Sequence, residues 1–307
     1  MSKIAFIFPG QGAQACGMGQ DFYEHTETGK RIFDKATELM GFSMPQLCFE
    51  ENDRLDITEY TQAAMVTASI AMMRVLEENG IKPDVAAGLS LGEYCALAAA
   101  GVMSDKDAIR TVRQRGILMQ EAVPVGEGAM AAILALDAAA IEEVTGAMEG
   151  VWIANYNCPG QIVISGEKAA VEDACEKLKA AGAKRAVMLN VSGPFHSGML
   201  ADAGEKLGEV LSQVELHEPQ IPYVANVTAQ YVKNAAEVKE LLTRQVSSSV
   251  RWQQSVEAMI ADGVDTFIEI GPGKTLAGFM RKISRDVKTL NVEKLEDISK
   301  VAEALKS

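Results

Sequence analysis

A serine lies at the centre of the pattern Gly88-Leu-Ser-Leu-Gly92. G-x-S-x-G between a strand and a helix is typical of a nucleophile elbow, a sharp turn that lifts the serine hydroxyl above the sheet. The first turn of the following helix has backbone N–H groups without internal acceptors, and these can stabilise an oxyanion. Because ordinary Gly-Ser turns share this pattern, Ser90 is a candidate nucleophile whose partners must come from elsewhere in the chain.

A serine needs a base to act as a nucleophile at neutral pH, and the chain has only three histidines. His25 lies in a charged helical segment and His217 lies between glutamates, so both are expected at the surface. His196, in Gly193-Pro-Phe-His-Ser197, lies at the exit of a predicted inserted domain, where the chain must pass the cleft between domains. A capping or core role is the alternative for His196, but by elimination it is the best partner for Ser90.

One arginine falls on the apolar side of a predicted helix at residues 105–122. The apolar stripe of this helix consists of Ala108, Val112, Met119 and Ala122. Arg115 lies on the stripe by helical spacing, whereas Arg110 and Arg113 point elsewhere and can be solvated. A buried guanidinium requires an anion, either an internal carboxylate or one that arrives with a substrate. With a nucleophile and a base, the second alternative indicates acyl transfer from a thioester that carries a free carboxylate.

Two glycine-rich segments imitate nucleotide-binding motifs. Gly10-Gln-Gly-Ala-Gln-Ala15 matches G-x-G-x-x-A, but the next helix is predicted about ten residues later instead of within the motif. Gly271-Pro-Gly-Lys-Thr275 resembles the end of a phosphate loop, yet Ile268 stands where its first glycine is required. No Cys/His spacing predicts a metal site. The sequence therefore predicts no cofactor, with a dinucleotide-dependent enzyme as the weaker alternative.

The alternation of elements predicts a parallel sheet covered by helices. Strands are expected at residues 4–8, 85–88, 221–227, 266–270 and 289–292. Helices are expected at residues 28–40, 61–79, 93–100, 105–122, 200–213, 236–246 and 251–262, with two more near the C-terminal end.

The segment between the two halves of this pattern has a different order. Residues 129–191 read as β-α-β-β-α-β, which is the ferredoxin-like order. We therefore expect an α/β fold with two domains, a large one formed by residues 1–125 and 197–307 and a small inserted one formed by residues 126–196.

Composition excludes several classes of protein. The chain of 307 residues has a formal net charge of −13, which argues against general binding to nucleic acid. Its five cysteines are scattered singly, as expected in the reducing cytosol rather than in a disulfide framework. No apolar run approaches the roughly 18 residues that span a membrane. We expect a cytoplasmic protein without nucleic-acid or membrane partners.

Several motifs in order make the chain similar to a known family. They are Phe8-Pro-Gly-Gln-Gly-Ala-Gln14, Gly88-Leu-Ser-Leu-Gly-Glu-Tyr94, Gln114-Arg-Gly116, Asn155-Tyr-Asn157, Gly193-Pro-Phe-His196, Arg244-Gln245 with Val250-Arg-Trp252, and Glu269-Ile-Gly-Pro-Gly273. Together they resemble the malonyl-CoA:acyl carrier protein transacylases in their free-standing form, from residue 4 to near the C-terminus. The resemblance implies an α/β-hydrolase-like large domain with an inserted ferredoxin-like small domain.

The resemblance also implies roles for individual residues. Ser90 would be the acylated nucleophile, His196 its base and Arg115 the group that holds the malonyl carboxylate. The backbone N–H groups of Gln11 and Leu91 would form the oxyanion hole.

Further residues follow from the same resemblance. The backbone carbonyl of Gln245 would orient the histidine, so no triad carboxylate is expected. Asn155 would lie near the substrate, and the ring of Phe195 would disfavour an α-methyl branch. The chain departs from many members at Leu89, where they have histidine, and at Ser249, where they have proline.

The implied reaction moves a malonyl group from malonyl-CoA to the phosphopantetheine thiol of acyl carrier protein through a malonyl-serine, for fatty acid synthesis. A serine hydrolase or thioesterase is the alternative for the same elbow, and Arg115 discriminates between them. Because carrier proteins are usually acidic, docking on this acidic chain would need a local basic patch. Its candidates are Lys184, Arg185, Lys274, Arg281 and Lys282.

Overall fold

The computed structural model describes residues 2–191 and 193–306; residues 1, 192 and 307, which belong to the predicted domains, lie outside the described residues. A five-stranded sheet has the order β7-β2-β1-β8-β9. Its strands are β1 (Ile4–Phe8), β2 (Val85–Gly88), β7 (Tyr223–Val224), β8 (Thr266–Ile270) and β9 (Lys288–Val292). Every neighbouring pair is parallel, as the alternation of elements predicts.

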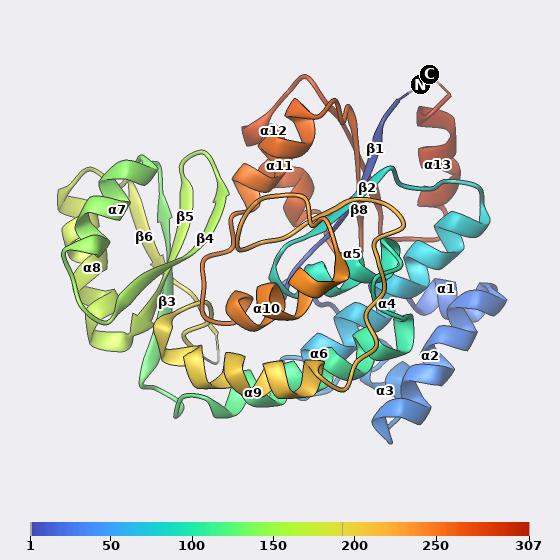
Figure 1. The fold of residues 1–307 in the computed structure, drawn as a ribbon, viewed down its shortest axis with the longest axis horizontal. Helices are drawn as coiled ribbons and strands as arrows, with labels where there is room; N and C mark the ends of the chain where they lie inside the picture. The colour runs from blue at the N-terminus through green and yellow to red at the C-terminus, as the bar shows by residue number, and fades with distance from the viewer. Residues whose placement is uncertain (1, 192, 307) are drawn as a thin grey trace.

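Helices cover both faces of this sheet (Figure 1). Side chains alternate along β1, so that Phe6 and Phe8 face one layer of helices while Ala5 and Ile7 face the other. The first layer contains α1 (Gln20–His25), α2 (Glu27–Met40), α3 (Met44–Phe49), α4 (Thr58–Glu78), α5 (Glu93–Ala99), α6 (Asp105–Glu121), α9 (Ala201–Leu211), α10 (Ala235–Gln245) and α13 (Asp297–Ala304). The second layer contains α11 (Trp252–Ala261) and α12 (Thr275–Ile283).

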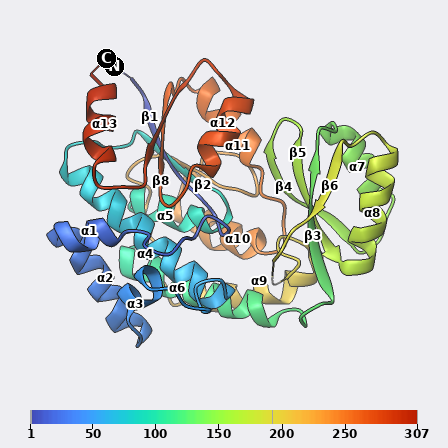
Figure 2. The same ribbon diagram turned by 180° about the vertical axis from the view of Figure 1, so that it is seen from behind.

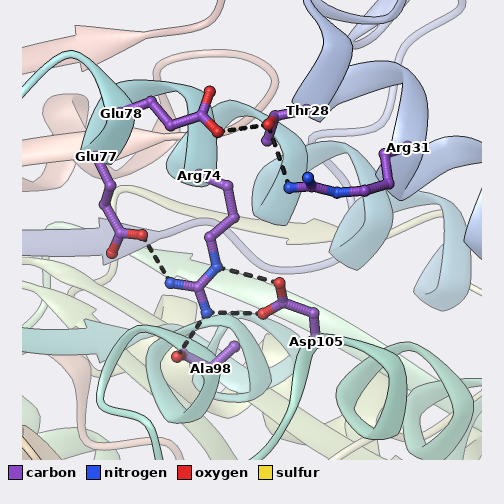
Figure 3. A network of polar contacts seen from close by, with 7 residues as sticks. All are labelled: Thr28, Arg31, Arg74, Glu77, Glu78, Ala98 and Asp105. Atoms are coloured by element: carbon purple, nitrogen blue, oxygen red, sulfur yellow. Dashed lines mark hydrogen bonds and ion pairs between the residues drawn. The ribbon is translucent and has the colours of Figure 1, made fainter.

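Helix α4 is the central helix of the first layer. Its apolar residues are buried on almost every side, which is typical of a helix enclosed by other elements. Its partly buried Arg74 donates hydrogen bonds from Nε and Nη2 to the Asp105 carboxylate at 3.1 and 2.7 Å (Figure 3). Arg74 also contacts Glu77 at 2.7 Å and the Ala98 carbonyl at 3.0 Å. This fork fixes the end of α5 and the start of α6 against α4.

A second sheet is antiparallel and lies to one side of the first (Figures 1 and 2). It has the order β4-β5-β3-β6, formed by β3 (Gly128–Leu134), β4 (Val151–Cys158), β5 (Gln161–Glu167) and β6 (Arg185–Met188). Helices α7 (Ala138–Gly146) and α8 (Lys168–Ala180) pack on one face. The other face contributes Met130 and Val163 to the core of the large sheet.

Hydrogen bonds join the second sheet to the segment between α10 and α11. Val250 donates to the Ala154 carbonyl at 2.8 Å, and Tyr156 donates to the Val250 carbonyl at 2.9 Å. The hydroxyl of Ser249 also donates to the Ile153 carbonyl at 2.5 Å. Strand β4 is therefore held directly to the segment that precedes α11.

Most predicted elements are confirmed, with three differences. Helices α1 and α3 have six residues each and were not predicted, because so short a segment has little periodicity. The strand expected at 221–227 pairs only over Tyr223–Val224, since the chain then turns away at the edge of the sheet. Strand β6 likewise ends at Met188 instead of residue 191. Within the described residues, no helix has the length and apolar character required to cross a bilayer.

Candidate active site

Ser90 occupies the turn between β2 and α5. Its φ angle is 53°, in the left-handed region that non-glycine residues rarely adopt. Such a conformation costs about 1–3 kcal/mol and persists only where the surroundings impose it. A short 3-10 turn, η1 (Ser90–Gly92), leads into α5. The pattern G-x-S-x-G thus forms the strand-turn-helix context that the sequence predicts.

The two glycines of the pattern allow strand and helix to approach closely. A Cβ on Gly88 would lie 1.9 Å from the Gly92 carbonyl carbon, and a Cβ on Gly92 would lie 2.2 Å from the Phe8 carbonyl oxygen. Both neighbours are backbone atoms, so neither can move without displacing a strand or the turn itself.

Gly92→Ala is expected to destabilise the protein by about 1–3 kcal/mol, because the strands must shift to admit the methyl group. Thermal or denaturant unfolding measures this loss. Gly278→Ala is the matched control, since Gly278 lies in α12 and its Cβ would meet no atom within 4 Å. That control should gain about 0.5–1 kcal/mol instead. Equal stability of the two variants would contradict the close packing of the elbow.

Ser90 and His196 are hydrogen-bonded to each other. The Ser90 Oγ lies 2.6 Å from His196 Nε2, and His196 Nδ1 donates to the Gln245 carbonyl at 2.8 Å. A carbonyl only accepts, so Nδ1 carries the proton and Nε2 is free to accept from the serine. The histidine is therefore oriented by a backbone carbonyl, and the side chains of His25 and His217 lie exposed elsewhere.

Burial lowers the pKa of His196 to about 4, and the nearby positive charge of Arg115 acts in the same direction. The imidazole is thus neutral at neutral pH, which is the state that a general base requires.

The ring resonances of His196 should accordingly stay those of the neutral form as the pH falls through 6, and should titrate only near pH 4. NMR of the protein labelled with ¹³C-histidine measures this midpoint, and a His196→Gln variant assigns the signal. A midpoint near the ordinary histidine value of about 6.5 would contradict the buried, neutral imidazole.

Arg115 is 1% exposed and points at the serine. Its Nη2 donates to Ser90 Oγ at 3.3 Å and to Gln245 Oε1 at 3.2 Å, and its Nη1 donates to Gln62 Oε1 at 2.8 Å. Among the described residues its Nε has no partner, and no carboxylate forms an ion pair with it within 4.0 Å. No carboxylate in the described part of the chain therefore pairs directly with Arg115. Burial lowers the pKa of Arg115, and the charge of the buried Glu93 carboxyl group opposes this without direct contact.

The neighbouring Arg113 lies off the apolar stripe, as the helical spacing predicts, but it is less solvated than that position allows. Its side chain is only 18% exposed, and its Nη2 lies 2.7 Å from Glu59 Oε2. Its guanidinium also lies 4.4 Å from the centroid of the Tyr60 ring. The helix spacing placed Arg113 correctly off the stripe, but the start of α4 covers that side of α6 as well.

Ser90, His196 and Arg115 line a cleft of about 610 Å³ between the two sheets. Gln11, Leu91, Asn155 and Phe195 also line it, so the structure brings all the predicted site residues together. The side chain of Gln11 donates to Thr58 Oγ1 at 3.1 Å, which holds the loop after β1 against α4. Leu91 lies in the first turn of a helical segment, where backbone N–H groups have no internal acceptor.

Three buried polar residues that hydrogen-bond to Ser90, Arg115 or Gln245 were not among the predicted site residues: Gln62, Glu93 and Asn226. Gln62 is the one with a usable signal, because an amide stands in an otherwise apolar stretch of a buried helix. Glu93 and Asn226 stand beside the elbow and after β7, and only the tertiary structure places them in contact.

No group of three or more histidine, cysteine, aspartate or glutamate side chains in residues 2–191 and 193–306 is arranged to hold a metal ion. Residues 10–15 form a loop along the cleft, and the first helix begins at Gln20, outside the glycine pattern. This loop lacks the helix start that a dinucleotide fingerprint requires.

Comparison with known proteins agrees with this geometry. The acyl transferase domain family matches residues 5–300. A malonyl CoA-acyl carrier protein transacylase of Bacillus subtilis is 50% identical, over 100% of this chain and 98% of that protein. A malonyl CoA-acyl carrier protein transacylase of Staphylococcus aureus is 43% identical, over 97% of this chain and 98% of that protein.

Solved structures of malonyltransferases also superpose on this chain. An acyl carrier protein S-malonyltransferase from Vibrio cholerae superposes with a TM-score of 0.95 at 42% identity, covering 98% of this chain and 100% of that one. A malonyl-transacylase in complex with its type II PKS acyl-carrier protein superposes with a TM-score of 0.95 at 40% identity, covering 99% and 100%. The resemblance read from the motifs is thus confirmed, and the chain belongs to the malonyl CoA-acyl carrier protein transacylase family of acyl transferases.

Proposed function

We propose that this protein transfers the malonyl group of malonyl-CoA to the phosphopantetheine thiol of acyl carrier protein, through a malonyl ester of Ser90, and so supplies fatty acid synthesis. The observation that carries the proposal is the position of Arg115. Its guanidinium is buried in the cleft, 3.3 Å from the Ser90 hydroxyl, with only neutral hydrogen-bond partners. A substrate carboxylate would complete its shell, since a guanidinium fork matches a carboxylate in two parallel hydrogen bonds.

The first half of the cycle acylates the enzyme. Ser90 Oγ attacks the thioester carbon while its proton passes to His196 Nε2, to which it is already hydrogen-bonded. The backbone N–H groups of Gln11 and Leu91 stabilise the oxyanion, with each such donor contributing about 10²–10³-fold in rate. The carbon-sulfur bond then breaks, and coenzyme A leaves with the proton from His196.

In the second half of the cycle the phosphopantetheine thiol of the carrier is the attacking group, and Ser90 is the leaving group. The carrier thiol gives its proton to His196 while its sulfur attacks the malonyl ester, and Ser90 Oγ takes that proton back as the ester bond breaks. Coenzyme A and phosphopantetheine enter as parts of substrates, and no step requires a metal or another cofactor. Asn155 and Phe195 lie on the wall of the cleft and would contact the acyl group.

We also infer that residues 1–125 and 197–307 form an α/β-hydrolase-like large domain and that residues 126–196 form a ferredoxin-like insertion. The support is the elbow at the end of β2 in a parallel sheet, and the order β4-β5-β3-β6 of the antiparallel one. A core of its own, which includes Ile133, Ile164 and Leu178, supports the small domain as a separate unit.

Transfer to a carrier tests the proposal. Incubation with malonyl-CoA and a carrier that bears phosphopantetheine should yield malonyl-carrier, whereas the same carrier without the prosthetic group should stay unmodified. Intact mass of the carrier gives the result. Release of malonate and coenzyme A without malonyl-carrier would favour a hydrolase and overturn the transferase assignment.

A further inference from the structure

The backbone of Ser90 is held by the side chain of a residue from another part of the chain. Asn226, 0% exposed, follows β7 and reaches across the end of β2. Its Oδ1 accepts from the Ser90 N–H at 2.6 Å, and its Nδ2 donates to the Gly88 carbonyl at 2.7 Å. One amide therefore spans the elbow from strand to nucleophile, and the donor and acceptor it meets fix its orientation.

The carbonyl of Ser90 is held as well. Gln245 Nε2 donates to it at 2.9 Å, and Gln245 Oε1 accepts from Arg115. Both backbone polar groups of the strained serine are thus bonded to side chains, and Gln245 connects Ser90 to Arg115 by its side chain and to His196 by its carbonyl.

A buried carboxylate joins the two amides. Glu93 is 1% exposed, and its Oε2 accepts from the Asn226 N–H at 3.1 Å and from Gln245 Nε2 at 2.7 Å. Because a guanidinium only donates, the oxygen of the Gln245 amide must face Arg115, which leaves the amide nitrogen to donate to Glu93. Burial raises the pKa of Glu93 to about 7, and these hydrogen bonds oppose the rise.

None of these contacts lies on the path of the proton or the acyl group. Glu93 and Asn226 do not line the cleft, and the Ser90 N–H is not one of the two proposed oxyanion donors. Their contacts instead determine where Ser90 Oγ, the Leu91 N–H and the oxygen of Gln245 stand relative to one another.

We propose that Asn226 and Glu93 are positioning residues of the acyl transfer. Asn226 holds the Ser90 turn between strand and helix, and this contact is called the clamp below. Glu93 fixes Asn226 and the Gln245 amide, so that the nucleophile, its histidine and the carboxylate-binding arginine keep one geometry. This inference rests on the proposed function for its reaction, but the clamp itself can be read from the reactivity of Ser90 alone.

Asn226→Ala should lower kcat for malonyl transfer by about 10²-fold, since small displacements of a reacting group have effects of that size. KM for malonyl-CoA should change less than threefold, because Asn226 does not line the cleft. The rate at which phenylmethylsulfonyl fluoride labels Ser90 should fall by a similar factor, since this small probe needs the elbow but neither the malonyl group nor Arg115.

Asn52→Ala is the control for loss of a partly buried loop amide that bridges backbone groups. Asn52 also bridges backbone groups, donating to the Leu47 and Glu50 carbonyls and accepting from Arg54 N–H and Leu55 N–H, but it does not line the cleft. It should lose thermal stability and keep the labelling rate. If the alanine variant of Asn226 does not fold, Asn226→Asp replaces it, since that variant keeps an oxygen for Ser90 and loses the donor to Gly88.

Two variants of Glu93 separate positioning from proton transfer. Glu93→Gln keeps an oxygen for both donors and should keep kcat within threefold, whereas Glu93→Leu removes the acceptor and should lower kcat at least about tenfold. A glutamine variant as slow as the leucine variant would overturn the positioning role, because it would require the charge or the proton of Glu93.

The outcomes distinguish the inference from the proposed function. Normal labelling and kcat in Asn226→Ala, with only a lower melting temperature, would reduce the clamp to a structural contact and overturn the inference. Slow labelling in this variant, with normal labelling in Asn52→Ala, would support the clamp even if the wild-type protein failed to transfer malonyl groups. Failure of the wild-type protein to transfer malonyl groups would reject the proposed function and leave the clamp intact.

Discussion

Ser90→Ala is expected to lower malonyl transfer to a carrier thiol by about 10⁴-fold or more, as for other enzymes that lose a nucleophile which acts together with its base. The reason is geometric: Ser90 Oγ is the atom that meets both His196 Nε2, at 2.6 Å, and Arg115 Nη2, at 3.3 Å. Steady-state transfer, followed by the mass of the carrier, measures the loss. Binding of malonyl-CoA should persist, because Arg115 and the cleft remain.

Cys95 provides the control for this experiment. It lies five residues after the serine, in α5, and it is 2% exposed. Burial raises the pKa of its thiol well above the ordinary range, so it is a poor nucleophile. Cys95→Ala should therefore transfer malonyl groups at close to the wild-type rate. Residual acylation of the Ser90→Ala protein that vanished with Cys95 would contradict the assignment of the serine.

Arg115→Ala should lose malonyl transfer selectively. Truncation of one partner of a buried charge pair costs about 2–5 kcal/mol, and only the malonyl group brings the second partner. Transfer of an acetyl group, which has no carboxylate, should fall much less, so the ratio of kcat/KM for malonyl-CoA to that for acetyl-CoA should collapse. Measurement of both values with the same preparation gives the ratio directly.

Arg113→Ala is the matched control, since it removes an arginine two positions away that pairs with Glu59 instead of facing the cleft. It should reduce stability modestly and leave the ratio of malonyl to acetyl transfer unchanged. Equal losses for both acyl groups in Arg115→Ala would mean that Arg115 supports the protein rather than the substrate carboxylate.

Local patterns were sufficient to predict most of the fold. Long segments with one clear period, such as α2 and α6, and the order of elements in residues 128–188 follow directly from side-chain spacing and turn residues. The short helices α1 and α3 and the two-residue strand β7 could not be predicted in this way, because tertiary contacts rather than periodicity define them.

The site residues also divide into those with a local sequence signal and those defined by tertiary contacts. Ser90 and Arg115 carry local signals, a turn pattern and a charge on an apolar stripe, and His196 could be found because the chain has so few histidines. Glu93 and Asn226 have no such signal. Their contact joins residues 133 positions apart in the chain, which no spacing rule reveals.

The malonyl ester of Ser90 can be detected without any acceptor. The protein is mixed with malonyl-CoA in the absence of carrier, and its intact mass is recorded within seconds. We expect a single malonyl adduct, absent in Ser90→Ala and removed by a carrier that bears the phosphopantetheine thiol. Turnover of malonyl-CoA without any adduct, or an adduct that persists in Ser90→Ala, would contradict the malonyl ester on Ser90.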